Sequence, residues 1–178
     1  MSQDWKLNAD THRKASHECP CGYFGDPKRE CRCSPNVVQR YRNRVSGPLL
    51  DRIDLHVEVP AIPLKQMTSD GAGEPSEKIR ARVESARQVQ RRRFEGRKKI
   101  TCNARMGAKE LKAFCKLDES SQELLKMALT TLNLSARAYD RILKVSRTIA
   151  DLENTEDIQA HHIQEAIQYR NLDRQLWV

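Results

Sequence analysis

One stretch of the sequence has the pattern of a β-strand, and it limits what the rest of the chain can build. Across residues 49–60, the apolar side chains that alternate with polar ones are Ile53, Leu55, Val57 and Val59. This period of two predicts a strand, yet a single strand is not stable without partners. No second convincing strand pattern occurs in the 178 residues, so partners must come from the amino-terminal arm or from outside this sequence. The sequence therefore predicts a mainly α fold that is only partly β.

After residue 75 the apolar residues recur at three- and four-residue steps, which is typical of helices. We expect helices over residues 76–97, 106–115, from 118 or 120, from 135, and over 159–170, with a short one over 36–45. Residues 61–75 are rich in proline and glycine and are predicted to be a linker. The predicted organisation is a flexible leader (1–18), a cysteine-rich loop with a short helix and the strand (19–60), the linker, and a helical domain (76–178).

Composition narrows the class of protein. With 38% hydrophobic and 31% charged residues, helices sharing a modest core are more plausible than a large sandwich or barrel. No apolar run approaches the roughly 20 residues that cross a bilayer, and no signal-peptide pattern opens the chain, so we expect a cytoplasmic protein without a membrane partner. The net charge of +8 favours polyanionic partners such as nucleic acid, or else only solubilises the surface.

Four of the six cysteines form two close pairs. Cys19 and Cys21, then Cys31 and Cys33, give C-x-C, nine residues, and C-x-C. Four thiolates around a Gly/Pro-rich loop can bind one zinc ion. The site would be structural, because four thiolates fill the tetrahedral coordination and leave no position for water. Free thiols are an alternative, and two disulfides are disfavoured in a reducing cytosol. The remaining cysteines, Cys102 and Cys115, are predicted to be small core residues.

Two arginines are candidates for phosphate contact. Arg52 lies at a turn just before the predicted strand, where its planar fork can reach a phosphoryl group of a neighbouring subunit. Its alternative is an ion pair with Asp51, Asp54 or Glu58. Arg137 lies in the first turn of a helix, where the macrodipole disfavours a cation. A cation at such a position suggests a nearby anion, and Arg141 follows one turn later. A solvated basic face is the alternative for this pair.

A long basic helix is the candidate nucleic-acid contact. Its ten cations are Lys78, Arg80, Arg82, Arg87, Arg91, Arg92, Arg93, Arg97, Lys98 and Lys99. We predict phosphate-backbone contacts by Arg91, Arg92, Arg93, Lys98 and Lys99; a solvated, partly salt-bridged helix is equally compatible. Aromatic residues are missing from this helix apart from Phe94, so it does not suggest base stacking. The pair His161 and His162 is predicted to be surface and boundary packing.

Several blocks of sequence together resemble one family. They are CPCGYFG (19–25), CRCSP (31–35), SGPLLDRIDLHVEVP (46–60), LSARAYDRILKV (134–145) and SRTIADL (146–152). In this order they are similar to the magnesium-chelatase-like (ComM) family of AAA+ ATPases, over Cys19 to about Arg170.

The resemblance implies a fold and a role for several residues. Residues 76–178 would be the helical lid of an AAA+ ATPase, and 19–60 the Cys-rich end of its core. Arg52 would be the arginine finger acting in trans on a neighbour's ATP, and Arg137 the sensor-2 arginine, with Arg137 and Arg141 toward the nucleotide. ComM-type members are hexameric DNA helicases that act in branch migration during natural transformation.

Two departures from the family pattern limit what this chain does alone. The sequence has no G-x-x-x-x-G-K-[ST] and no apolar strand ending in paired acids before the cysteines. His17 and Glu18 occupy the place of the family's Asn-Pro. We therefore expect a fragment that uses ATP and magnesium only as part of a complete ATPase and does not hydrolyse ATP alone.

Three other functions stay open. The chain can be a stand-alone, zinc-containing module that binds nucleic acid. It can also be a regulatory partner that docks on a full-length AAA+ subunit instead of associating with copies of itself. A chelatase role in tetrapyrrole synthesis is disfavoured by the cysteine loop.

Overall fold

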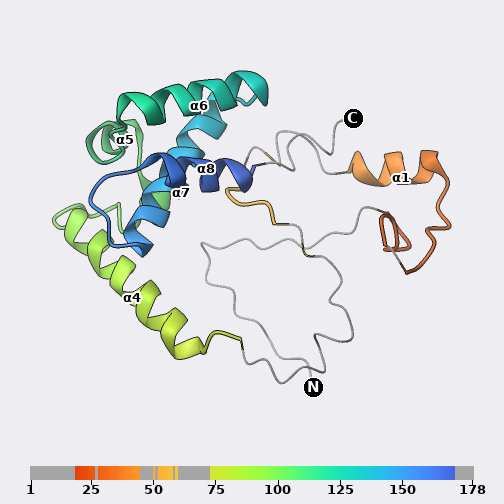
Figure 1. Cartoon of the computed structure of the whole chain (residues 1–178), viewed down its shortest axis with the longest axis horizontal. Coiled ribbons are helices and arrows are strands. Elements are labelled where there is room, and N and C mark those ends of the chain that lie inside the picture. Colours follow the sequence, from red (N-terminus) through yellow and green to blue (C-terminus); the bar gives the residue numbers. More distant parts are fainter. Residues whose placement is uncertain are drawn as a thin grey trace. The chain divides into compact units, whose positions relative to one another are not determined.

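The computed structural model describes residues 19–26, 28–44, 50, 52–57, 59 and 73–170. These residues fall into two compact units that divide between Ser46 and Gly47. The first contains the cysteine-rich loop and helix α1 (Pro35–Arg42), and the second contains the remaining helices (Figure 1). The described part of the chain has helices and no strand, which confirms the mainly α fold.

The second unit is a helical domain built around α7. Its elements are α4 (Ser76–Arg93), the 3₁₀ turn η1 (Asn103–Arg105), α5 (Ala108–Phe114), α6 (Glu119–Thr131), α7 (Ala136–Leu152) and α8 (Ala160–Gln168). Helix α7 contacts α4, η1, α5 and α8, while α6 packs on α8. The apolar stripe predicted from the three- and four-residue steps is the core of this domain, and Ile142 is fully buried at its centre.

Local signals explain several of the helix ends. The Ser135 hydroxyl accepts a hydrogen bond from the backbone N–H of Ala138 at 3.2 Å, as expected of the predicted N-cap. Asp118 caps α6 in the same way, accepting from the backbone N–H of Ser121 at 2.9 Å. Helix α4 ends at Arg93, earlier than the predicted Arg97, because the chain turns through Gly96, whose φ of +78° is accessible to glycine without strain.

The strand predicted within residues 49–60, from the alternation of Ile53 to Val59, is not formed in the described residues 52–57. The backbone N–H of His56 instead donates to the carbonyl of Tyr169 at 2.9 Å. Burial is the reverse of the predicted alternation, because His56 is buried while Leu55 and Val57 are 47% and 62% exposed. Without a neighbouring strand among the described residues, the segment pairs with the end of α8.

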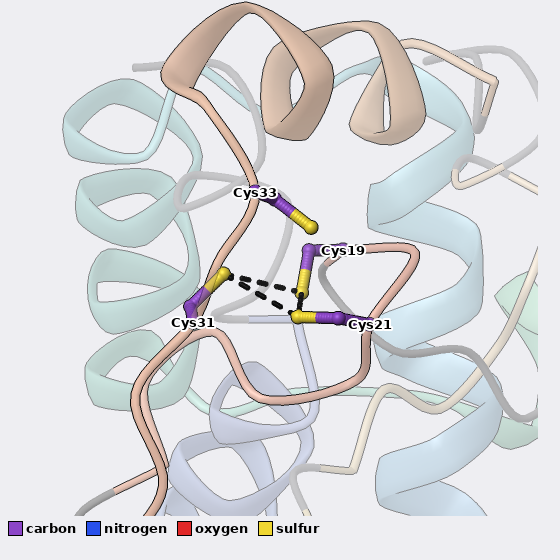
Figure 2. Close-up of side chains that lie close together, drawn as sticks. All are labelled: Cys19, Cys21, Cys31 and Cys33. Carbon is purple, nitrogen blue, oxygen red and sulfur yellow. Dashed lines mark hydrogen bonds between the residues drawn. The ribbon is translucent and has the colours of Figure 1, made fainter.

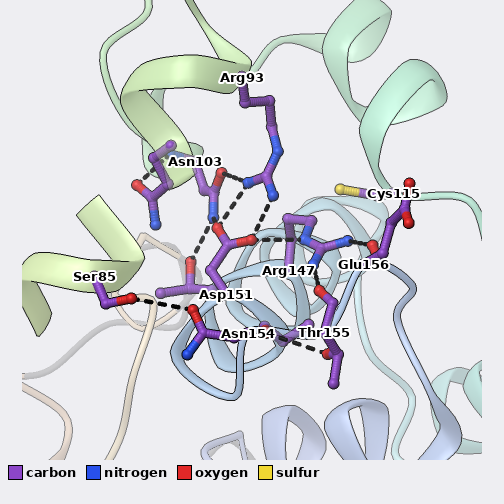
Figure 3. A network of polar contacts seen from close by, with 12 residues as sticks. Ser85, Arg93, Asn103, Cys115, Arg147, Asp151, Asn154, Thr155 and Glu156 are labelled. Carbon is purple, nitrogen blue, oxygen red and sulfur yellow. Dashed lines mark hydrogen bonds and ion pairs between the residues drawn. The ribbon is translucent and has the colours of Figure 1, made fainter. Parts of the chain in front are cut away.

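A buried polar network joins α4, η1 and α7 (Figure 3). Arg93 forms a bidentate ion pair with Asp151, whose side chain is fully buried. The same carboxylate accepts from the Asn103 amide at 2.7 Å and from Arg147 Nε at 3.1 Å. Arg147 also donates to the carbonyls of Thr155 and Glu156. One carboxylate therefore holds together segments distant in the sequence.

Two carboxyl groups at helix ends make the stability of this domain depend on pH. Contacts with Ser121 and Ser120 lower the pKa of Asp118, and hydrogen bonds from His161 and His162 lower that of Glu153. A depressed pKa stabilises the fold above the ordinary values of 3.8 and 4.5, and this stabilisation disappears as pH falls through the folded pKa values.

We therefore expect the thermal midpoint of unfolding to fall in acid, as measured by circular dichroism. Asp118→Asn is the informative variant, because asparagine keeps the N-cap hydrogen bond but does not titrate. Its midpoint should fall less steeply over the same acidic range. An unchanged slope in both Asp118→Asn and Glu153→Gln would contradict the assignment.

Among the residues that the structure describes, no helix is both long enough and apolar enough to cross a membrane.

Candidate metal centre and arginine cluster

The cysteine-rich loop returns on itself through two tight turns. In the first, the N–H of Gly22 donates to the carbonyl of Cys19 at 3.1 Å, and Gly22 has a φ of +79° that favours glycine. In the second, Asp26 Oδ1 accepts the backbone N–H groups of Lys28 and Arg29 at 2.7 and 3.1 Å. These turns bring the second cysteine pair back to the first.

The four predicted ligands lie together (Figure 2). The Sγ atoms of Cys19 and Cys21 are 3.3 Å apart, and Cys31 Sγ lies 3.7 Å from that of Cys19 and 3.6 Å from that of Cys21. All four sulfurs, including that of Cys33, lie within 4.8 Å of one another, and none forms a disulfide. A tetrahedron with Zn–S bonds of 2.3 Å has edges of about 3.8 Å. The cluster therefore has the size of a four-thiolate metal site.

The surroundings shift the pKa values of two of the cluster's thiols in opposite directions. The backbone N–H of Tyr23 and then the Cys19 thiol stabilise the Cys21 thiolate and lower its pKa to about 6. The Cys33 backbone N–H lowers the pKa of Cys31, but desolvation and the bonds to Cys21 and Cys19 outweigh it and raise this pKa to about 12. Cys21 is thus the thiol of the cluster that ionises most readily. A divalent cation would stabilise the other thiolates and release their protons.

We expect the purified chain to contain about one zinc and Cys31→Ser to contain almost none, because three thiolates do not close the tetrahedron. Metal content per chain is measured by mass spectrometry. Cys102→Ser is the matched control, since Cys102 is also half-buried but lies outside the cluster. Full zinc content in Cys31→Ser would contradict a site made by these four residues.

The candidate phosphate-binding arginines lie in the second unit. Arg52 is exposed at a turn, and Arg137 is exposed in the first turn of α7; the structure gives neither an ion pair with any described residue. Arg141, one helical turn after Arg137, forms an ion pair with Asp54. Asp54 is thus engaged by Arg141 and not by Arg52, while Asp51 and Glu58 lie outside the described residues.

The predicted DNA-contact residues separate into two groups. Arg91, Arg92, Lys98 and Lys99 are exposed. Arg93 is directed inward, where Asp151 and Asn103 hold its guanidinium. The structure thus leaves four of the five predicted cations available to a polyanion.

The structure also brings together a cluster that the sequence did not predict. Glu153 Oε2 lies 3.0 Å from His161 Nε2 and 2.9 Å from the Nε2 of the fully buried His162. His162 Nδ1 accepts the backbone N–H of Gln159 at 2.9 Å, so the proton of the neutral ring is on Nε2, where a metal would need a lone pair. The cluster therefore caps α8 and is a poor metal site. Glu153 is too far along the chain for a local motif to reveal this.

Comparison with known proteins agrees with this arrangement. Residues 73–170 match the family model of the magnesium chelatase subunit ChlI C-terminal domain, and residues 11–67 match that of magnesium chelatase subunit ChlI. The chain belongs to the magnesium-chelatase-like family. This confirms the resemblance found in the sequence blocks, and assigns the helical domain around α7 to the family's C-terminal domain.

Individual relatives within the magnesium-chelatase-like family point the same way. The competence protein ComM of Haemophilus influenzae is 42% identical over 163 residues, which cover 91% of this chain and 31% of ComM. The uncharacterized protein YifB of Salmonella typhimurium is 44% identical over 165 residues, again 91% of this chain and 31% of YifB. An uncharacterized protein of Mycobacterium tuberculosis is 30% identical over 156 residues, 88% of this chain and 30% of its own length. The chain spans about a third of the length of these relatives.

Proposed function

We propose that this chain provides the lid and the phosphate-stabilising arginines of a ComM-type AAA+ ATPase. The observation that carries the proposal is the arrangement of Arg52 and Arg137. Both are exposed without an ion pair among the described residues, and the Asp54–Arg141 ion pair ties the turn of Arg52 to the helix of Arg137. Such a connected pair of cations is suited to one shared anionic target.

The chemistry follows from the guanidinium groups. A transferring phosphoryl group spreads negative charge over its oxygens, and arginine forks placed against it stabilise that charge. Arg52 acts in trans as the finger, and Arg137 as the sensor-2 residue, with Arg141 holding the segment that carries Arg52. ATP and magnesium are bound by another polypeptide segment, because this sequence has no phosphate-binding loop.

Assembly and DNA complete the proposal. The chain acts within a hexamer, by self-association or by docking on a full-length AAA+ subunit, and the hydrolysed ATP drives movement on DNA in branch migration. Arg91, Arg92, Lys98 and Lys99 support this by offering exposed charge to the phosphate backbone. The four cysteines hold one structural zinc that keeps residues 19–44 folded.

The test measures ATP turnover in a mixture. The partner is full-length ComM of H. influenzae, in a variant without its own arginine at the position that aligns with Arg52. The chain alone should not turn over ATP, the ComM variant alone should do so slowly, and the mixture should be faster than either. Turnover by the chain alone, or no stimulation in the mixture, would contradict the proposal.

A further inference from the structure

The first unit pairs aromatic rings with arginines at three places. The guanidinium carbon of Arg29 lies 5.1 Å from the ring centroid of Tyr23, and Arg29 also donates to the Tyr23 hydroxyl at 2.8 Å. Arg42 lies 4.6 Å from the ring centroid of Phe24. The third pair, Arg44 and Tyr41, has a separation of 5.4 Å. Three aromatic rings are therefore each in contact with an arginine within one short segment.

The first two rings are also accessible. Tyr23 and Phe24 are 36% and 43% exposed, on the loop between the two cysteine pairs. An apolar ring gains nothing from facing water, and here two adjacent rings do so. The Phe24–Arg42 contact links this loop to α1, so the rings are held on a small folded unit.

The charge of the same unit is strongly positive. Residues 19–44 contain six basic side chains, namely Lys28, Arg29, Arg32, Arg40, Arg42 and Arg44. They contain only two acids, and the carboxylate of one of these, Asp26, already accepts two backbone N–H groups. An acidic partner is therefore favoured over a neutral or basic one.

We propose that residues 19–44 form a binding surface for single-stranded nucleic acid, on which unpaired bases stack against Tyr23 and Phe24. Arg29 and Arg42 add guanidinium planes to the stacking surface, and Arg32, Arg40 and Lys28 contact phosphates. Exposed rings among cations are what single strands require, because every base has a π-face and every nucleotide a phosphate. A duplex keeps its bases stacked on one another, so they are not available to the two rings. An acidic peptide would bind the cations but would leave the two adjacent rings without a stacking partner. This deepens the proposed function by naming the form of nucleic acid and the surface that takes it.

The test uses the full 178-residue chain, loaded with zinc and without ATP, and labelled oligothymidylate in fluorescence anisotropy. The double substitution Tyr23→Ala/Phe24→Ala should weaken binding at least about tenfold, the loss expected from removing stacking rings. Tyr139→Ala is the matched control, because Tyr139 is a similarly exposed ring (39%) on α7, and it should bind as the original chain does. An abasic deoxyribose-phosphate oligomer of equal length should also bind more weakly, and oligouridylate competition compares RNA with DNA.

Cross-linking keeps the test decisive if the alanine variant loses its zinc. Oligothymidylate with 5-iodouracil substitutions should cross-link, on the unmodified chain, to the peptide that contains Tyr23 and Phe24. Cross-links confined to residues 76–99 would overturn the proposal and assign binding to the basic residues of that segment. Equal binding of the abasic oligomer would also overturn it, because the bases would then contribute nothing. The binding assay contains no ATP, so its outcome is independent of the ATPase stimulation test. A failure of either proposal can therefore be distinguished from a failure of the other.

Discussion

Arg52→Ala should lower the stimulated ATP turnover of the mixture about 1,000-fold or more, the range expected when an arginine finger is removed. The reason is that the guanidinium stabilises charge present only in the transition state, so its loss changes the rate more than nucleotide binding. The measurement compares kcat and KM of the mixture of chain and ComM variant. We expect a collapse of kcat with KM for ATP nearly unchanged.

Controls separate this role from charge alone. Arg80→Ala removes another exposed arginine, from α4, and should leave kcat unchanged. Arg52→Lys keeps the charge without the planar fork and should recover only a small part of the rate. If Arg52→Ala and Arg80→Ala give equal rates, Arg52 is not a finger and the proposed function loses its central residue.

The connection between Asp54 and Arg141 shows where prediction from the sequence ended. Helix periodicity predicted the domain around α7, and the close spacing of cysteines predicted their clustering, because both signals are local. The Asp54–Arg141 pair joins residues 87 positions apart. Other acids lie three and four positions from Asp54, and other cations lie four and three positions from Arg141, so no local pattern distinguishes the cation that pairs from the cation that stays exposed.

The segment around His56 shows a second limit. A segment of alternating apolar and polar residues forms a strand only when a neighbouring strand is available, and the described residues offer none. Backbone pairing with Tyr169 and burial of His56 depend on the end of α8, more than a hundred positions further along the chain. Likewise, Arg91, Arg92 and Arg93 are chemically equal in sequence. Only the turn of α4 directs the last of them to Asp151.

Asp151→Ala should lower the free energy of unfolding of the helical domain by about 3–5 kcal/mol, the cost of breaking a buried ion pair. The substitution leaves Arg93 and Arg147 as cations without their carboxylate, and their side chains are only 12% and 4% exposed. Asn103 also loses an acceptor for its amide. Urea unfolding followed by circular dichroism measures the change. Asp140→Ala, an exposed acid on the same helix, should alter it by no more than about 0.5 kcal/mol.

A double substitution tests whether the cost comes from unpaired charge or from lost volume. If charge dominates, Arg93→Leu/Asp151→Leu should be less destabilised than Asp151→Ala, even though it removes more polar contacts, because one cation is removed together with the carboxylate. Arg147 would still donate to the carbonyls of Thr155 and Glu156, and so it would keep part of its hydrogen bonding. A double variant less stable than Asp151→Ala would instead mean that the network contributes mainly through its packing and geometry. In that case Asp151 would matter because its shape orients α4 on α7, and Asp151→Asn, which preserves that shape, should then be nearly as stable as the original chain.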